Sequence, residues 1–310
     1  MEGITIQIPQ KPDNLLKLEI LQKRKSLNRT DRSKLAVIKK GYQGELYFAT
    51  LITHFLSHKT MVLYDLFLEW GDSYFQIDCL VFSDGELYLL DIKNFEGNYV
   101  YQNDNFYSLI QEKYIKNPLH QLKRGEILLQ DMLNHHNLQY TIHAYLVFIH
   151  SSFILYEAPI TLPIIYSGQM KAFLKKMNTK LKNVTNQDRK FALMLKEKHL
   201  IKNNFAYQPD YVFESLKRGI FCLRCNGLLH KKGRKLLKCA KCHMIETYES
   251  AVLRMVIEFA TLFPDEKLTL RKIYRWTGGF VPVRRISSIM KKYMNVCGSH
   301  KGTYYKFDNR

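Results

Sequence analysis

One stretch of the chain decides the expected fold: Ile77-Asp78-Cys79-Leu80-Val81-Phe82-Ser83-Asp84-Gly85-Glu86-Leu87-Tyr88-Leu89-Leu90-Asp91-Ile92-Lys93. Two segments rich in β-forming residues flank Asp84-Gly85, and Asp-Gly between such segments is a strong hairpin signal. With these two residues as the loop, Ser83 pairs with Glu86. Counting outward in step then places Asp78 opposite Asp91.

The polar residues of this hairpin share one face of the predicted sheet. Side chains alternate between faces along a strand, so Asp91 and Lys93 point the same way, and Asp78 joins them from the neighbouring strand. Opposed like charges about 5 Å apart destabilise a sheet unless a cation lies between them. The stretch therefore predicts a divalent-metal site with a lysine beside it. The alternative is an edge hairpin whose polar residues are all solvated, since a register shift of one residue turns every side chain to the other face.

The composition is that of a globular protein. The chain has 310 residues, of which 46% are hydrophobic and 24% charged, enough for two or three domains with a sizeable core. We find no uncharged apolar run of roughly 18 residues, so we expect no membrane span. The start, Met1-Glu2-Gly3-Ile4, lacks the basic and apolar segments of a secretory signal. We therefore expect a cytoplasmic protein without a membrane partner.

Positive charge is concentrated at the two ends of the chain. The net charge is +19, with 10 Lys/Arg against 4 Asp/Glu in residues 1–40 and 21 against 6 in residues 217–310, whereas residues 41–216 carry 16 against 18. Cationic flanks around a nearly neutral centre suit a polyphosphate substrate held by charge and counterion release. A solvated basic surface is the alternative.

The patterning predicts five segments: a basic helical arm at 1–40, an α/β domain at 41–201, a linker at 202–216, a cysteine module at 217–248 and a basic helical segment at 249–310. The α/β domain follows from the order helix, three or more strands, helix, strand. Its first helix is expected to begin at Gly41, separate from a helix that begins near Thr30.

Two further polar residues lie on apolar helix faces of this domain. Glu45 follows Gly41-Tyr42-Gln43-Gly44 and faces inward with its helix, unless it is simply a first-turn glutamate favoured by the helix dipole. Gln121 shares a face with Gly125 and Leu128 on the helix expected from Leu119 to Leu133, unless it is a surface glutamine.

These parts together resemble the nuclease-related domain called NERD, a family of the PD-(D/E)XK nuclease superfamily. The resemblance covers about residues 41–150. It rests on Gly41-Tyr42-Gln43-Gly44-Glu45 opening a helix, an aspartate before a turn, Leu90-Asp91-Ile92-Lys93-Asn94 followed by Gly97, and Asn117-Pro118 with Gln121 after it. It implies a restriction-endonuclease-like α/β core and a Mg²⁺-dependent phosphodiesterase. The usual glutamate of the acidic-x-Lys step is Asp91 here, one methylene shorter.

The resemblance also implies roles for individual residues. Asp78, Asp91 and the carbonyl of Ile92 would hold one or two Mg²⁺ (or Mn²⁺), which prefer hard oxygen ligands. Lys93 would position or help deprotonate the attacking water, and Glu45 would bind metal directly or through water. Gln121 matches the helix glutamine of the family. These five side chains, Asp78, Asp91, Lys93, Glu45 and Gln121, are the predicted catalytic residues of a nuclease whose expected substrate is DNA.

Four cysteines form a separate module. Cys222-Leu223-Arg224-Cys225 and Cys239-Ala240-Lys241-Cys242 are separated by thirteen residues. Two CxxC pairs at this distance predict a four-thiolate structural Zn²⁺ site, here resembling a zinc ribbon. A redox or disulfide pair is the alternative.

The last segment carries three expected helices, at 251–263, 269–276 and 283–294, followed by a strand pair around Lys301-Gly302. This order predicts a winged-helix DNA-binding unit with the third helix as the reader. A plain three-helix bundle or a dimer interface is the alternative.

Two rivals to the enzyme hypothesis remain open. One is a non-catalytic DNA-binding protein built on a decayed nuclease scaffold. The other is an adaptor whose ribbon and tail dock a helicase or similar DNA-processing protein. No glycine-rich loop ending in Gly-Lys-Ser/Thr occurs, so any motor would be a separate chain.

Overall fold

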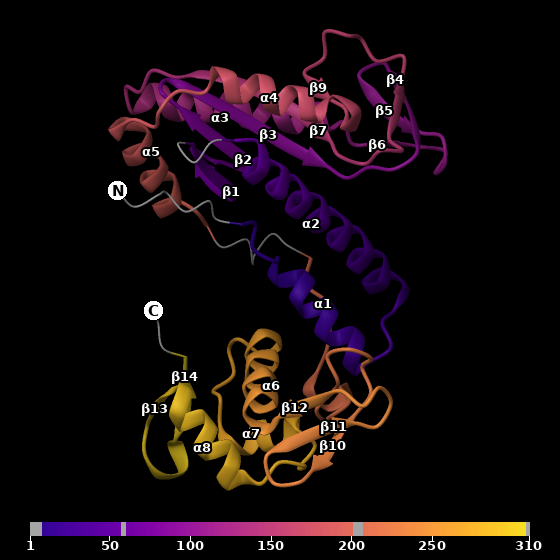
Figure 1. The fold of residues 1–310 in the computed structure, drawn as a ribbon, viewed down its shortest axis with the longest axis vertical. Coiled ribbons are helices and arrows are strands. Elements are labelled where there is room, and N and C mark those ends of the chain that lie inside the picture. Colours follow the sequence, from indigo (N-terminus) through magenta and orange to yellow (C-terminus); the bar gives the residue numbers. More distant parts are fainter. Residues whose placement is uncertain (1–7, 57–59, 201–206, 308–310) are drawn as a thin grey trace. The chain divides into compact units, whose positions relative to one another are not determined.

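A computed structural model describes residues 8–56, 60–200 and 207–307, and Figure 1 draws them as a ribbon. The chain divides into two compact units, which we call unit 1 (residues 1–11 and 36–206) and unit 2 (residues 12–35 and 207–310). The segment predicted as a basic arm is therefore divided between them. Within the described residues, no helix combines the length and the apolar character that crossing a membrane requires.

The core of unit 1 is a five-stranded sheet of order β1-β2-β3-β7-β9. Its strands are β1 Met61–Trp70, β2 Ser73–Ser83, β3 Glu86–Lys93, β7 Thr141–Phe148 and β9 Ile164–Ile165. The first three strands pair antiparallel, and β7 is parallel to both β3 and β9. The central hairpin has the predicted register, from Ser83 opposite Glu86 to Cys79 opposite Leu90. Asp78 and Asp91 are the next residues outward.

Helices cover both faces of this sheet, because alternate residues of its strands are apolar in both directions. On one face, Leu80 and Leu89 pack with α3 (Pro118–His135) and α5 (Asn186–Glu197). On the other face, Val81 and Leu90 pack with α2 (Arg29–Phe55) and α4 (Met170–Lys180). The structure is thus the expected α/β layered domain.

Helix α2 differs from the sequence prediction. It runs without a break from Arg29 to Phe55, so the separate helix expected to begin at Gly41 is wrong. No proline interrupts the segment, and a glycine inside a helix costs only about 1 kcal/mol. Gly44 has a packing reason: an added Cβ would lie 2.9 Å from Cβ of Asn94 and 2.8 Å from Cδ1 of Ile149. The helix therefore approaches the end of β3 closely at this point.

Unit 1 also contains a four-stranded sheet of order β6-β5-β4-β8. Three of its strands come from the segment between β3 and α3, and the fourth follows β7 in the sequence. Its strands are β4 Asn98–Gln102, β5 Asn105–Ser108, β6 Lys113–Ile115 and β8 Ile154–Tyr156. Phe148 at the end of β7 stacks on Phe153, with ring centroids 3.8 Å apart, which joins this sheet to the main core. Asn117 then caps α3 by accepting a hydrogen bond from the N–H of Leu119 at 2.9 Å.

Unit 2 contains the cysteine module and the C-terminal helices. Its elements are α1 Asp13–Arg24, β10 Leu229–Lys232, β11 Leu236–Cys239, β12 Ile245–Thr247, α6 Tyr248–Leu262, α7 Leu270–Trp276, α8 Val283–Tyr293, β13 Asn295–Cys297 and β14 Tyr304–Lys306. Short 3-10 helices cover Phe213–Ser215 and His300–Gly302 here, and Ser167–Gln169 in unit 1. Strands β10, β11 and β12 form one antiparallel sheet.

The C-terminal part of unit 2 has the winged-helix order. Three helices, α6, α7 and α8, precede the antiparallel β13–β14 pair. Leu268, between α6 and α7, bridges to Tyr305 of β14, whose N–H donates to the Leu268 carbonyl at 2.8 Å. This isolated bridge between the first and second helices is consistent with the order expected of a winged helix.

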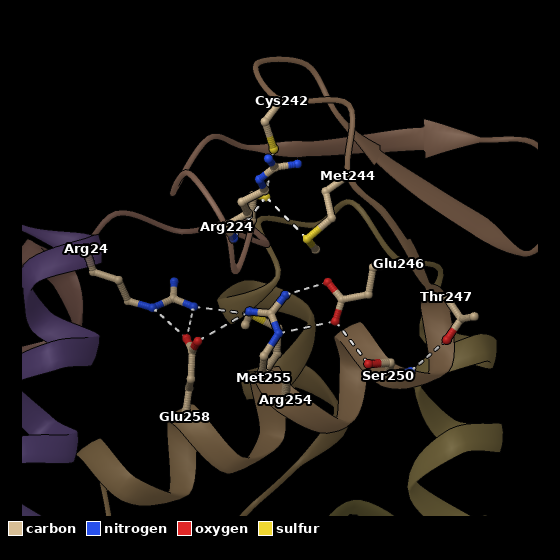
Figure 2. Close-up of polar contacts among 11 residues, drawn as sticks. Arg24, Arg224, Cys242, Met244, Glu246, Thr247, Ser250, Arg254, Met255 and Glu258 are labelled. Carbon is tan, nitrogen blue, oxygen red and sulfur yellow. Dashed lines mark hydrogen bonds and ion pairs between the residues drawn. The ribbon is translucent and has the colours of Figure 1, made fainter. Parts of the chain in front are cut away.

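Helix α1 packs against α6 through a buried ion network (Figure 2). Arg24 is fully buried, and its Nη2 lies 2.6 Å from Oε2 of Glu258. Its guanidinium also stacks over the Trp276 ring at 3.7 Å. Arg254 lies between Glu258 and Glu246, with its Nη2 2.8 Å from Oε2 of Glu246. The N-terminal helix is therefore an internal part of unit 2.

Candidate functional site

The two predicted aspartates lie side by side at the end of the central hairpin. Asp78 is 8% exposed and Asp91 5% exposed. The β2–β3 pairing ends at Cys79 and Leu90, and one residue further the Asp78 side chain replaces the backbone partner: the N–H of Ile92 donates to Oδ2 of Asp78 at 2.9 Å. The N–H and C=O of one strand residue point to the same side. The Ile92 carbonyl therefore points toward the strand that carries Asp78.

Lys93 completes a buried charge cluster with these carboxylates. Its Nζ forms an ion pair with Oδ1 of Asp91. Burial lowers the pKa of Lys93, but the charges of Asp91 and Asp78 outweigh burial, so the pKa lies above its ordinary value. Burial raises the pKa of Asp91 to about 6, and the neighbouring charge of Asp78 adds to this effect. The cluster thus holds two carboxylates that repel each other and one fully charged ammonium.

The donor set of this cluster fits a hard divalent cation. Oδ1 of Asp91 is buried, and among the described residues it contacts the ammonium of Lys93. Two buried carboxylates beside a single ammonium leave a negative charge that is costly to bury, and Mg²⁺ takes carboxylate and carbonyl oxygens as ligands. Asp78, Asp91 and the carbonyl of Ile92 therefore have the chemistry of a Mg²⁺ or Mn²⁺ site.

Glu45 lies close to the cluster without completing it. It is half-buried on α2, and its charge contributes to the raised pKa of Lys93. Among the described residues, however, only the four cysteines of unit 2 bring three or more His, Cys, Asp or Glu ligand atoms close enough for one metal ion. The reason is topological: Asp91 shares its strand face with Leu89, which packs with α3, whereas α2 covers the opposite face.

Gln121 is exposed on α3. It lies one turn before Gly125, where an added Cβ would be 3.9 Å from Cδ1 of Leu89 in β3. Its helix face is thus directed toward β3. Within the described ranges no hydrogen bond joins it to either aspartate. The structure brings Asp78, Asp91 and Lys93 together and leaves Gln121 outside their contacts.

Two residues of this site escaped the sequence analysis. Nε2 of Gln76 donates to Oδ1 of Asp78 at 3.0 Å and to Oδ1 of Asp65 at 3.2 Å. Asp65 has a φ of +51° and lies between the pairs Tyr64–Cys79 and Leu66–Ile77, so it is level with Asp78. It is the single charged residue from Met61 to Leu68. Counting outward from the Gly71-Asp72 turn would have placed it there.

The four predicted cysteines form a second candidate site. Their Sγ atoms all lie within 4.8 Å of one another, with Cys222 and Cys242 3.5 Å apart and Cys225 and Cys239 3.4 Å apart. Backbone N–H groups of Cys242 and Lys241 lower the pKa of the Cys239 thiol to about 6. Four thiols at these separations fit a tetrahedral Zn²⁺ ion.

The backbone around the cysteines is shaped for this cluster. The residue after each CxxC pair, Asn226 or His243, has a φ near +60° (61° and 59°), and its N–H donates to the carbonyl of Cys222 or Cys239 at 3.1 Å. Each pair thus ends in the same tight turn, which aims both of its sulfurs inward. At Gly227, an added Cβ would lie 3.2 Å from Sγ of Cys239.

Comparison with known families agrees with the α/β architecture and with the resemblance seen in the sequence. Residues 40–149 match the family model described as NERD, nuclease-related domain. The chain therefore contains a nuclease-related domain, and this region includes Glu45, Asp78, Asp91, Lys93 and Gln121. Searches of curated proteins and of solved structures gave no match.

Proposed function

We propose that this protein is a metal-dependent nuclease of the PD-(D/E)XK type that hydrolyses phosphodiester bonds in DNA. The observation that carries the proposal is the buried pair Asp78 and Asp91 beside Lys93, inside a nuclease-related domain. The pair carries more negative charge than Lys93 neutralises, which favours a bound cation over a purely structural ion pair. We propose the cytoplasm as its compartment, because all six cysteines are unpaired and this usage suits a reducing environment.

The proposed mechanism divides the work among these residues. Asp78, Asp91 and the Ile92 carbonyl would hold Mg²⁺ or Mn²⁺, which supplies an activated water and charge stabilisation at the phosphate. Lys93 would position the attacking water or help deprotonate it, and would stabilise developing negative charge. Gln76 would fix the orientation of Asp78, and Glu45 would contact water near Lys93.

Unit 2 would supply binding. Its zinc ribbon and winged helix carry the positive charge of the C-terminal segment, 21 Lys/Arg against 6 Asp/Glu in residues 217–310. Contacts to phosphates give affinity that depends on salt and little on sequence. A single structural Zn²⁺ would hold the ribbon in shape.

A cleavage assay tests the enzyme proposal. Purified full-length protein is incubated with plasmid, linear duplex, single-stranded DNA and RNA, with Mg²⁺ or with a chelator. We expect Mg²⁺-dependent cutting of DNA that Asp91→Asn and Lys93→Ala each abolish. Asp72→Asn, the same chemical change at an exposed turn, is the matched control. Cutting that survives the chelator, or an Asp91→Asn variant as active as Asp72→Asn, would contradict the proposal.

A second candidate function is favoured by the positions of Glu45 and Gln121, which do not complete a cage with the aspartates. In this second hypothesis, the nuclease-related domain no longer cleaves DNA. The protein would bind DNA or dock a DNA-processing partner such as a helicase on a separate chain. Absence of cleavage on all four substrates, together with equal Mn²⁺ binding by the wild type and Asp91→Asn, would favour this candidate.

A further inference from the structure

The β10–β11 hairpin of the ribbon carries uncompensated positive charge at its tip. Residues 217–248 contain nine Lys/Arg and a single acid, Glu246. Glu246 is buried and paired with Arg254, so it is not available to the tip. Four exposed basic residues surround the turn at Gly233, and no ion pair within the described residues engages them: Lys231, Lys232, Arg234 and Lys235.

Helix α8 has a basic face built from small and cationic residues. Its inner face is apolar, with Ile286, Ile289 and Met290 buried. The opposite face holds four residues at helical spacing: Arg284, Ser287, Ser288 and Lys291. Arg284 and Lys291 are exposed, and the sequence contains no acid from residue 267 to residue 307. Serines between two cations let another molecule approach the helix backbone closely.

The other two cations of α8 already have partners inside unit 2. The Arg285 guanidinium lies over the ring of Tyr248 at 4.4 Å. Nζ of Lys292 lies 2.7 Å from Oε1 of Glu249. The cations that remain accessible are therefore those on the outward face, which is the arrangement expected if this face binds an external anion.

Tyr248 connects the tip of the ribbon to the start of α8. Its backbone N–H donates to the carbonyl of Lys235 at 3.2 Å. Tyr248 is only 5% exposed. Its ring stacks on Phe280, with ring centroids 6.5 Å apart, and the Arg285 guanidinium lies over the same ring. Tyr248 therefore links the two segments: its backbone contacts Lys235, and its ring contacts Arg285 in the first turn of α8. The hairpin tip and the start of α8 are thus joined through one buried residue.

From these contacts we propose that the tip of the β10–β11 hairpin and the outward face of α8 act as one surface that binds double-stranded DNA. The proposal rests on nucleic acid being the substrate of the protein, and it adds which residues hold it and in which form. An α-helix with short side chains fits the major groove, and lysines beside it fit the phosphates that fix its register. Single strands are usually held by aromatic stacking platforms, and Arg284 to Lys291 contains no aromatic residue.

Equilibrium binding to duplex DNA tests this surface. All variants are made in the full-length, zinc-loaded Asp91→Asn protein, so that cleavage does not interfere. Fluorescence anisotropy with a labelled duplex is measured at several salt concentrations. The variants are Lys232→Ala/Lys235→Ala at the tip, Arg284→Ala/Lys291→Ala on α8, and the four changes combined. Lys175→Ala/Lys176→Ala, on α4 of unit 1, removes the same charge elsewhere and is the matched control.

We expect each surface pair to weaken duplex binding by at least about 10-fold and to reduce the slope of log K against log salt by about 2, one for each lost phosphate contact. The combined variant should lose both contributions. The α4 control should keep the parent affinity and slope. Zinc content and thermal unfolding equal to those of the parent establish that each variant is folded.

Three results would overturn the proposal. A tip pair that binds duplex like the α4 control would remove the ribbon from the surface. Stronger binding of single strands than of duplex by the parent would assign another ligand form. Unchanged duplex binding together with lost binding to a polyglutamate peptide would assign an acidic protein partner. Failure of the nuclease proposal gives a different result. The wild type would then not cleave DNA, while the surface variants would still bind duplex more weakly than their parent.

Discussion

Each unit contains a cluster of buried charges, and the two clusters differ in their balance. In unit 2, Arg24 and Arg254 face Glu246 and Glu258, two cations against two anions, and each carboxylate contacts a guanidinium. In unit 1, the buried carboxylates of Asp78 and Asp91 lie beside one cation, Lys93, whose Nζ pairs with Oδ1 of Asp91.

This difference separates a structural cluster from a chemical one. A balanced buried network holds two helices together and gains nothing from an added ion. A network with excess negative charge, one of whose pKa values is raised, is stabilised by a cation. Substitutions that change one cluster at a time should therefore separate the two kinds: those in unit 2 should alter the free energy of unfolding, and those in unit 1 should alter metal binding and cleavage.

The largest effect is expected for Asp91→Asn. It removes one proposed metal ligand while keeping the shape of the side chain, so the rate of DNA cleavage should fall by at least about 10³-fold. The free energy of unfolding of the metal-free protein should change little, because a repelling buried charge is lost. Chemical denaturation of the same sample provides this second readout. If the Asp91→Asn protein is strongly destabilised but its folded fraction still cleaves DNA, the role of Asp91 is structural.

Arg24→Ala should have the opposite signature. It leaves Glu258 buried with only Arg254 at 3.5 Å, so unit 2 should lose about 3–5 kcal/mol of unfolding free energy. Lys272→Ala, at an exposed pair with Glu266, is the control and should cost less than about 1 kcal/mol. Denaturant titration in a Trp70→Phe background, in which Trp276 is the single tryptophan, measures both by fluorescence. An unchanged midpoint for Arg24→Ala would show that the network is not structural.

Gln76→Ala should act on the metal through Asp78. Residues that orient a metal ligand typically change metal affinity by about 10 to 100-fold. We expect the Mn²⁺ dissociation constant to rise by that factor, while duplex affinity in the absence of metal stays the same. Saturating metal should restore much of the cleavage rate. A lower maximal rate at every metal concentration would instead mean that Gln76 contacts the reacting groups.

The smallest effect is a pH dependence confined to unit 1. The pKa of Asp91 is raised from 3.8 to about 6, so the folded protein holds a proton that the unfolded chain releases between these values. The free energy of unfolding of the metal-free protein should therefore fall as pH rises from about 4 to about 6, and metal binding should weaken as pH falls through about 6. Asp91→Asn should remove both trends. Persistence of the stability trend in that variant would assign it to another group.

Sequence reasoning succeeded where the deciding interactions are local. The register of the central hairpin follows from its two-residue turn, and the four-cysteine cluster follows from two CxxC pairs. Asp65 was equally predictable, because a second tight turn fixes its position opposite Asp78.

Sequence reasoning was weaker where position depends on packing between distant segments. The face of a helix can be read from its apolar pattern, but the sheet face that it covers cannot, and this decides how far Glu45 lies from the aspartates. Helix α2 continues through Gly41 and Gly44, and close packing against the end of β3 favours a glycine at Gly44. Nothing in the sequence links Arg24 to Glu258, 234 residues away, so the place of α1 inside unit 2 could not be predicted.

The central claim is that Asp78 and Asp91 hold a catalytic cation that unit 2 does not share. Calorimetric titration of Mn²⁺ into zinc-loaded wild type and Asp91→Asn at pH 7.5 tests it most directly. The claim predicts saturable binding by the wild type that the variant loses, with equal zinc content in both. Equal Mn²⁺ binding by the two proteins would contradict it.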